Sequence, residues 1–581
     1  MSLIALPTAA RTPELVRAAA LFCLSLIACL SSVAALAAEV ALAIEPVSTH
    51  GTGIFARSSA EVPAYCDVSR RVFVVNAESG QVDVMAISAD GALSKVGSIA
   101  AARDVPGAMK AVNSVAVSRG RLAVAVEADP PTAPGAVAFY DTRMLNLLGS
   151  LPAGSLPDMV TFSTDGRWAL VANEGESNHD ATIDPEGTIT VVDLAKGVEH
   201  ATSRTVGFRD WNADGLRARE LPDLIARGLR HFGRVRVPGD ASDSRAATFA
   251  EDVEPEWIEI DPESRTAYVS LQEANAIAVI DIARAAVERI MPLGFKDHGR
   301  AGNQLDTSDK DGGVSLRSWP GLYGVFQPDT IRLLVAGERR YLVTANEGDS
   351  RVRPYADGII EGVKEGAFFT DEASPGDWPL DGTAFAAAAA PADLGRLKVV
   401  RDLVERHLDG QGRPTRLFAF GARSFSIFDA TTGDLVFDSG ADFERIIAER
   451  HPDAFNVSND ATRVDARSRS KGPEPEGLAI GTVEGRTFAF VGLERVGGVM
   501  VYDITDPARP QHVGFHLNRR CDVPLQLDDG STNPAGGDSG PEGLIFVAAE
   551  RSPTGRPLLI VGNETSGTTT VWQISGRPAA E

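Results

Sequence analysis

A loosely repeated unit runs through the chain and constrains its fold more than any other feature. Each copy begins with an acidic or amide residue, continues through a short apolar strand and a turn, and ends a second apolar strand in Asn-Glu or a similar pair. A third strand ending in Asp usually follows, and many copies add a fourth. The leading residues are Glu61, Asn113, Asp158, Glu256, Asp329, Glu476 and Glu542. Four short strands repeated in this way are typical of the blades of a β-propeller, whereas a pair of β-sandwiches would not repeat the unit.

The repeats predict an all-β propeller of seven or eight four-stranded blades. Seven units carry the leading residue, and a weaker piece at 417–429 lacks the leading strand. The last unit has no outer strand, and residues 44–48 resemble the outer strands of other units. We therefore expect an N-terminal strand to complete the last blade and close the ring. Long helical or loop insertions interrupt the units at roughly 194–250, 294–325, 350–415 and 440–472.

The first 37 residues read as a signal peptide, which leaves 38–581 as a single propeller domain. Arg11 and Arg17 precede an uncharged apolar run, and small residues at 35–37 form a cleavage site. A retained membrane anchor is one alternative. A lipid on Cys29 is another, because residues 26–29 match a lipoprotein processing box. The cleaved chain contains no other apolar stretch long enough to span a bilayer, and its expected location is the periplasm or the extracellular medium.

Two cysteines remain after cleavage, Cys66 near the start and Cys521 near the end of the chain. A ring-shaped fold would bring these regions together, and an oxidising compartment permits a disulfide. The alternative is two unpaired thiols.

Repeated carboxylates are the strongest functional signal. The acid that opens each unit and the Glu that ends its second strand are expected at the same face of the propeller, around the central channel. Such crowding requires neutralisation by cations or protonation. Carboxylate oxygens suit calcium above magnesium, although acids at turns also bond backbone amides. The candidate metal ligands are Asp158, Glu174, Glu256, Asp329, Glu347, Glu476 and Glu542.

Charge and basic residues narrow the function further. The net charge of -23 argues against a nucleic-acid partner. Arg423 stands where the weak unit should carry its Asn-Glu, and Lys471 and Arg495 also interrupt the acidic positions. Such residues either bind a phosphate or sulfate or neutralise the charge of the neighbouring carboxylates. His298 is a candidate base or a surface histidine. Arg423 and His298 are the candidate catalytic residues.

Several longer stretches resemble the bacterial choice-of-anchor I family over nearly all of the mature chain. They include residues 156–162, 294–298, 344–349, 420–426, 471–477 and 491–495. The resemblance implies an exported propeller-like protein. Some members are labelled alkaline phosphatase-like, and others resemble animal mesenchyme-surface glycoproteins. The resemblance supplies no catalytic residues.

Two functions follow from these observations. The first is a ligand-binding or surface-recognition module with a calcium-binding acidic face, whose partner is a small molecule, a phosphoester or a cell-surface ligand. The second is a calcium-dependent phosphoesterase similar to propeller phytases and phosphatases, in which metal-activated water is the nucleophile. The crowded carboxylates favour the enzyme, and the absence of a nucleophile motif favours the binding module.

Overall fold

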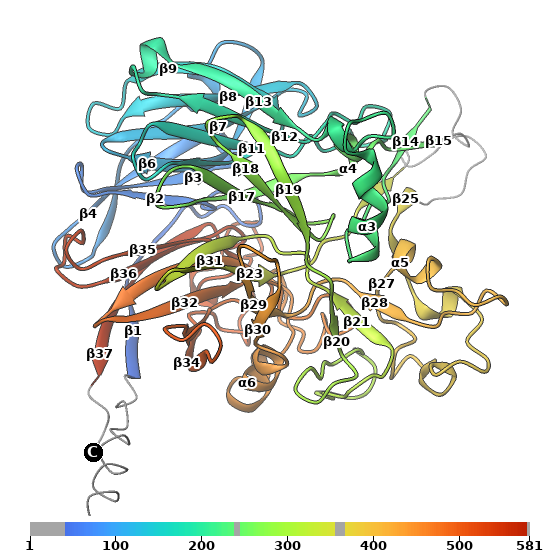
Figure 1. Cartoon of the computed structure of the whole chain (residues 1–581). Coiled ribbons are helices and arrows are strands. Elements are labelled where there is room, and N and C mark those ends of the chain that lie inside the picture. The colour runs from blue at the N-terminus through green and yellow to red at the C-terminus, as the bar shows by residue number, and fades with distance from the viewer. Residues whose placement is uncertain (1–40, 238–243, 355–366, 578–581) are drawn as a thin grey trace, which may run out of the picture. The chain divides into compact units, whose positions relative to one another are not determined.

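Alternating apolar residues in short strands fold into antiparallel four-stranded sheets (Figure 1). The computed structural model describes residues 41–237, 244–354 and 367–577. Residues Ile44–Ser575 form one compact unit. The expected signal peptide and Cys29 lie outside the described residues.

The described residues contain seven such sheets, which we number as blades in chain order. The first three blades are β2 (Pro63–Cys66), β3 (Arg71–Asn76), β4 (Gln81–Ile87) and β5 (Leu93–Ile99); β6 (Met109–Ser118), β7 (Arg121–Ala128), β8 (Pro134–Asp141) and β9 (Leu147–Ser155); and β10 (Pro157–Phe162), β11 (Trp168–Asn173), β12 (Thr188–Asp193) and β13 (Thr202–Gly207). The fourth and fifth are β16 (Pro255–Ile260), β17 (Thr266–Leu271), β18 (Ala276–Asp281) and β19 (Ala286–Pro292); and β22 (Ile331–Ala336), β23 (Arg339–Asn346), β29 (Ser424–Asp429) and β30 (Leu435–Asp438). The sixth and seventh are β31 (Pro475–Val483), β32 (Arg486–Leu493), β33 (Val499–Asp503) and β34 (Gln511–His516); and β35 (Pro541–Val547), β36 (Leu558–Asn563), β37 (Thr568–Arg577) and β1 (Ala41–Gly51).

The inner strands of successive blades contact one another in a closed series. The contacts run from β2 to β6, β10, β16, β22, β31 and β35, and β35 contacts β2 again. The inner strands surround a cavity of about 250 Å³, which we call the central channel. The prediction of a β-propeller is confirmed, and of the two expected blade counts the structure has seven.

The predicted N-terminal closure is also confirmed, because β1 pairs with β37 as the outer strand of the seventh blade. The hydroxyls of Thr49 and Thr570 lie 2.9 Å apart, and Ser48 accepts a hydrogen bond from the backbone of Leu93 on the first blade. The strand therefore removes the free edge of one blade and contacts the next.

The weak unit at 417–429 is not an eighth blade. Its second half is β29, the third strand of the fifth blade, which pairs with β23 across a long insertion. Its first half is β28 (Leu417–Ala419), which joins a five-stranded sheet made only of insertion segments. More than 70 residues separate β23 from β29 in the sequence. In the sequence pattern, this one blade therefore resembles two incomplete blades.

The insertions carry the helices and the remaining short strands. The helices are α2 (Ala101–Asp104), α3 (Leu221–Ala226), α4 (Phe249–Asp252), α5 (Arg401–Glu405) and α6 (Asp442–Arg450). The 3₁₀ turns are η1 (Ala77–Ser79), η2 (Val198–His200), η3 (Arg209–Trp211), η4 (Ala218–Glu220), η6 (Pro375–Asp377), η7 (Ala386–Ala388), η8 (Pro452–Ala454) and η9 (Pro534–Gly536). The strands are β14 (Arg234–Arg236), β15 (Ser244–Ala246), β20 (Phe295–Asp297), β21 (Leu322–Val325), β24 (Val352–Pro354), β25 (Ala367–Thr370), β26 (Glu372–Ala373) and β27 (Val399–Val400). Among the described residues, none of the helices has the length and apolar character needed to cross a membrane.

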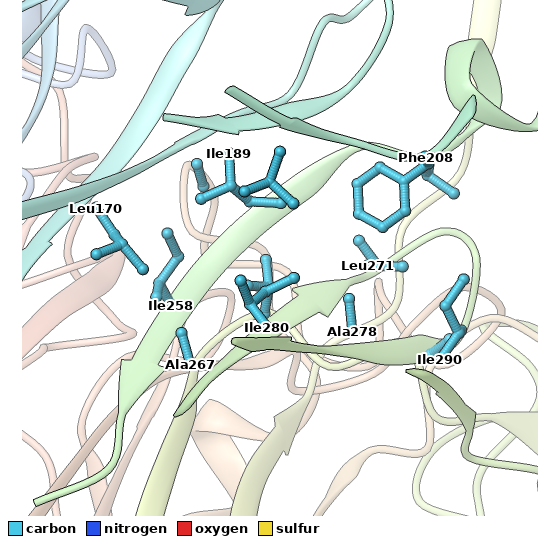
Figure 2. Packing of buried hydrophobic residues seen from close by; sticks show 14 of the residues in the cluster. Leu170, Ile189, Phe208, Ile258, Ala267, Leu271, Ala278, Ile280 and Ile290 are labelled. Carbon is cyan, nitrogen blue, oxygen red and sulfur yellow. The ribbon is translucent and has the colours of Figure 1, made fainter. Parts of the chain in front are cut away.

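Apolar side chains fill the space between neighbouring blades. Figure 2 shows Leu170 and Ile189 of the third blade packed toward Ile258 and Ile280 of the fourth. Burying one such side chain contributes about 1.5–3 kcal/mol. The alternation of residues along each strand places one apolar row against each neighbouring blade, and this packing holds the inner strands at a common axis.

The two cysteines are buried and free. Cys66 lies in the core between the first and second blades, where its thiol donates to the hydroxyl of Thr142 at 3.4 Å. Cys521 packs in the core of the sixth blade. The two thiols therefore belong to separate cores, and the unpaired alternative describes the structure.

Candidate functional site at the channel mouth

Four of the leading acids lie at irregularities where the inner strands begin. In the third blade, Pro157 pairs with Asn173 and Met159 with Ala172, so Asp158 has no partner on β11. The same shift in register surrounds Glu256, Glu476 and Glu542. Such bulges bend a strand and redirect the extra side chain. The Pro-acid pairs of the sequence therefore encode side chains that leave the sheet where the inner strand starts.

A second recurring contact, found in the third, sixth and seventh blades, joins the residue before the inner strand to the end of the second strand. The residue before the Pro has a positive φ, and its carbonyl accepts the backbone N–H of the Glu that ends the second strand. The contacts are Glu174 to Leu156 at 3.0 Å, Glu494 to Glu474 at 2.8 Å and Glu564 to Gly540 at 2.8 Å, with φ of +48°, +52° and +74° at the three acceptors. Non-glycine residues adopt this conformation only where the surroundings require it. The contact sets the leading acid beside the second-strand glutamate.

The leading acids of different blades act on one another electrostatically. Burial raises the pKa of Glu256, and Glu273, Asp329, Glu174 and Asp158 raise it further. Burial and Glu127 raise the pKa of Asp158 to about 7. Burial raises the pKa of Glu61 and of Glu542, and the charge of Glu61 raises the pKa of Glu542 further. These carboxyls therefore surround one space, which we call the acidic mouth and define by its six leading acids, Glu61, Asp158, Glu256, Asp329, Glu476 and Glu542.

Three carboxylates of the acidic mouth and its rim come close enough to share one ion. One oxygen from each of Asp329, Glu347 and Glu476 lies within 4.8 Å of the others; we call these residues the carboxylate triad. Lys471 and Gln272 each donate to Glu347 at 2.8 Å. By contrast, one oxygen of Glu476 is buried and has no hydrogen-bond partner among the described residues.

Unpartnered oxygens recur around the mouth. Within the described ranges, one buried oxygen of each of Glu61, Glu256 and Glu494 also accepts no hydrogen bond. A buried carboxylate without a partner costs free energy unless it is protonated or bound to a cation. An all-oxygen donor set of this kind fits a hard divalent cation.

A second carboxylate group, next to the triad, is neutralised by the protein itself. The oxygens of Glu347, Glu474 and Glu494 also lie within 4.8 Å of one another. Glu474 is fully buried and forms ion pairs with Arg467, with Lys471 at 3.0 Å and with Arg495 at 3.1 Å. Burial opposes ionisation of Glu474, but Lys471, Arg495 and Arg467 hold its pKa well below the ordinary value. This group is an ion-pair network and has no need of a metal.

Not every predicted acid reaches the mouth. Glu174 and Glu273 lie beside Asp158 and Glu256, as their mutual effects on pKa indicate. Glu78, at the corresponding position of the first blade, lies in η1 with its side chain 45% exposed and faces Arg57 at 3.8 Å.

Arg423 is buried, and its side chain is paired within the protein. Its two terminal nitrogens donate to Glu444 at 2.8 Å and to the backbone carbonyls of Asp306, Ser468 and Ser470 at 2.6–2.8 Å. Both nitrogens are thus committed to the protein, and none of the contacts holds Arg423 toward the acidic mouth.

His298 is buried rather than exposed, with 1% of its surface accessible. Its Nδ1 lies 2.7 Å from the carbonyl of Asn303, and burial lowers its pKa to about 3. The neutral ring packs against Gly324, where an added Cβ would lie 2.8 Å from Nε2. The surface alternative is therefore wrong, and the ring serves packing within the 294–325 insertion.

Sequence reasoning missed three residues that shape the site. Glu474 was visible only as part of a Pro-Glu-Pro-Glu run, and Arg467 and Lys398 come from insertions that carry no repeat. The one available signal was the alternation of basic residues at 463, 467, 469 and 471 in an acidic chain.

The fold and the site define a seven-bladed β-propeller with an acidic channel mouth. Residues 61–507 match the model of the choice-of-anchor I domain, so the chain belongs to the choice-of-anchor I family, as the resemblance implied. It is 33% identical over 299 residues to the mesenchyme-specific cell surface glycoprotein of Strongylocentrotus purpuratus, covering 46% of this chain and 37% of that protein. It is 29% identical over 181 residues to Gigasin-3a of Magallana gigas, covering 28% of this chain and 60% of that protein. The chain thus spans less than two thirds of either relative.

Among solved structures, a chain of Kuenenia stuttgartiensis hydrazine synthase aligns with a TM-score of 0.41 and 12% identity. The alignment covers 89% of this chain and 96% of that one.

Proposed function

We propose that this protein is an exported propeller that binds an external ligand through a calcium ion held at the acidic mouth. The observation that carries the proposal is the carboxylate triad of Asp329, Glu347 and Glu476, whose oxygens lie within 4.8 Å of one another. The unpartnered buried oxygen of Glu476 supports it. Calcium accepts six to eight oxygen ligands in flexible geometry, which suits carboxylates contributed by separate blades.

An extracytoplasmic location agrees with the family and with the name of the sea-urchin relative, a cell surface glycoprotein. It also agrees with the signal peptide expected at residues 1–37. Extracellular calcium is abundant enough to occupy weak sites, because extracellular modules bind it with dissociation constants of about 10⁻⁴–10⁻³ M.

The test is a calcium titration followed by the thermal unfolding midpoint, with a chelator as the starting state. At a free calcium concentration of about 100 times the dissociation constant, binding to the native state stabilises it by about 2.7 kcal/mol. We expect Glu476→Gln to lose this response. Its stability without calcium should not fall, because the change removes one of several mutually repelling carboxylates.

The matched control is Glu449→Gln, on a side chain that is 58% exposed on α6 and pairs with Arg445 at 3.3 Å. This variant should keep the full calcium response. An equal response in Glu476→Gln and Glu449→Gln would refute the site. A parallel titration with magnesium tests the choice of ion, since we expect the stabilisation to be smaller for magnesium.

The second candidate function is a calcium-dependent phosphoesterase. One observation favours it: Glu347 of the triad accepts a hydrogen bond from Lys471 at 2.8 Å, so a cation and a positively charged side chain would act on the same ligand. Bound calcium would polarise a phosphoester and lower the pKa of a bound water. Calcium-dependent release of phosphate from a generic phosphomonoester, lost in Glu476→Gln, would establish this activity. Calcium binding without release would leave the binding module as the function.

A further inference from the structure

A small polar cavity beside the carboxylate triad presents an unusual concentration of cations. It measures about 140 Å³, and its wall includes Lys398, Arg467, Lys471 and Arg495 but only two carboxylates, Asp349 and Glu372. This arrangement stands out in a chain whose net charge is -23. Lys471 belongs both to this wall and to the contact with Glu347, so the cavity adjoins the triad.

Glu474 fixes three of the four cations of this wall, Arg467, Lys471 and Arg495, which we call the inner wall. This carboxylate is fully buried, accepts hydrogen bonds from Arg467 and Arg495, and forms an ion pair with Lys471. Arg495 also pairs with Glu494 at 2.8 Å. Fixed side chains lose little conformational entropy when a ligand binds, so the wall is preorganised.

Each of the two arginines has a terminal nitrogen that makes no hydrogen bond or ion pair with the described residues. Nε and Nη2 of Arg467 donate hydrogen bonds to Glu474. Nε of Arg495 donates to Glu474, and its Nη1 forms an ion pair with Glu494. Among the described residues, no hydrogen-bond acceptor contacts Nη1 of Arg467 or Nη2 of Arg495. Guanidinium groups with spare donors are suited to oxyanions.

We propose that this cavity binds one oxyanion group of the ligand, a phosphate, sulfate or carboxylate. The inference rests on the proposed function, because it identifies the part of the ligand that lies next to the cation. A volume of about 140 Å³ is below the roughly 300–1,000 Å³ of pockets that hold a whole drug-sized ligand. The cavity therefore fits a single charged group, and the remainder of the ligand lies outside it.

The experiment measures binding of inorganic phosphate, sulfate and acetate by calorimetry to the full chain, with a chelator present and the ionic strength held constant. We expect saturable binding of at least one anion. Arg467→Gln should weaken it about tenfold, since a hydrogen bond to a charged partner is worth at least that factor. The anion that binds most tightly identifies the chemical class of the group.

Two further variants keep the test decisive. Lys398→Gln alters the outer wall, where Lys398 contacts Glu372 at 2.6 Å and is 31% exposed, so the fold should survive and the affinity should fall. Arg520→Gln removes the same charge at an exposed pair with Asp522 and should leave the affinity unchanged. Absence of saturable binding by all three anions, or unchanged affinity in Lys398→Gln, would overturn the proposal and leave the cations as partners of the neighbouring carboxylates.

The result of the anion-binding experiment can be distinguished from the result of the calcium titration. Glu476→Gln should retain anion binding in the presence of chelator while it loses the response to calcium. Anion binding without any calcium response would retain the cavity and refute only the cation at the triad.

Discussion

Replacing Glu474 with glutamine is expected to lower the free energy of unfolding by about 3–5 kcal/mol, the usual cost of removing one partner from a buried ion pair. The carboxylate is fully buried and forms ion pairs with Lys471, Arg467 and Arg495. Glutamine keeps the shape but not the charge, so it leaves three cations with one counter-charge fewer. The measurement is chemical denaturation of the purified protein, read as the shift in transition midpoint at constant slope.

The control for Glu474→Gln lies two residues away. Glu476→Gln has the same change in charge and volume, but Glu476 has carboxylates rather than cations as its strongest electrostatic neighbours. The first variant should be clearly destabilised and the second should not. Equal stability of the two variants in chelator would contradict the role assigned to Glu474.

Replacing Arg423 with methionine is expected to destabilise the protein to a similar degree, about 3–5 kcal/mol. The substitution leaves Glu444 buried without its cation and removes the donors to three backbone carbonyls. These contacts join α6, the segment before β31 and the 294–325 insertion, so we expect the loss to be global. Thermal and chemical unfolding both measure it.

The same variant separates a structural role from a functional one. At a temperature where Arg423→Met remains folded, its affinity for calcium and for small anions should equal that of the unmodified protein. Arg520→Met is the control, because Arg520 is 62% exposed and pairs only at the surface. If Arg423→Met lost anion binding but kept normal stability, Arg423 would be a residue of the binding site.

Local patterns predicted most of the blades because the first four and the sixth are each built from four strands consecutive in the sequence. Alternating apolar strands with a turn every few residues are sufficient to define an antiparallel sheet, and the outer-strand pattern at 44–48 was sufficient to predict the closing strand β1. The fifth blade could not be read in this way. Its strands β23 and β29 are separated by an insertion, so their pairing depends on contacts that no local pattern records.

The acidic positions followed from the repeat as well. Each Pro-acid pair at the start of an inner strand recurs at the same place in its blade, and symmetry about the axis brings those places together. The assignments of Arg423 and His298 rested on single residues in insertions, where no repeat constrains the position. The structure buries both of these residues, and their contacts are with backbone carbonyls and Glu444.

The sequence by itself determined the fold class and the leading acids, because both follow from a short unit repeated along the chain, and it determined the family through longer stretches such as 344–349 and 471–477. Only the tertiary structure decided which acids are paired with cations. Glu474 and Glu476 are two residues apart in the chain, yet one faces Lys471, Arg467 and Arg495 while the other faces carboxylates of neighbouring blades. Residues two apart on a regular strand share a face, but Glu474 precedes β31 with a φ of +52° and Glu476 lies in the bulge at the start of that strand, so the two side chains have different surroundings. Those surroundings come from insertions and other blades, so the charge around each acid is set by three-dimensional packing rather than by sequence position.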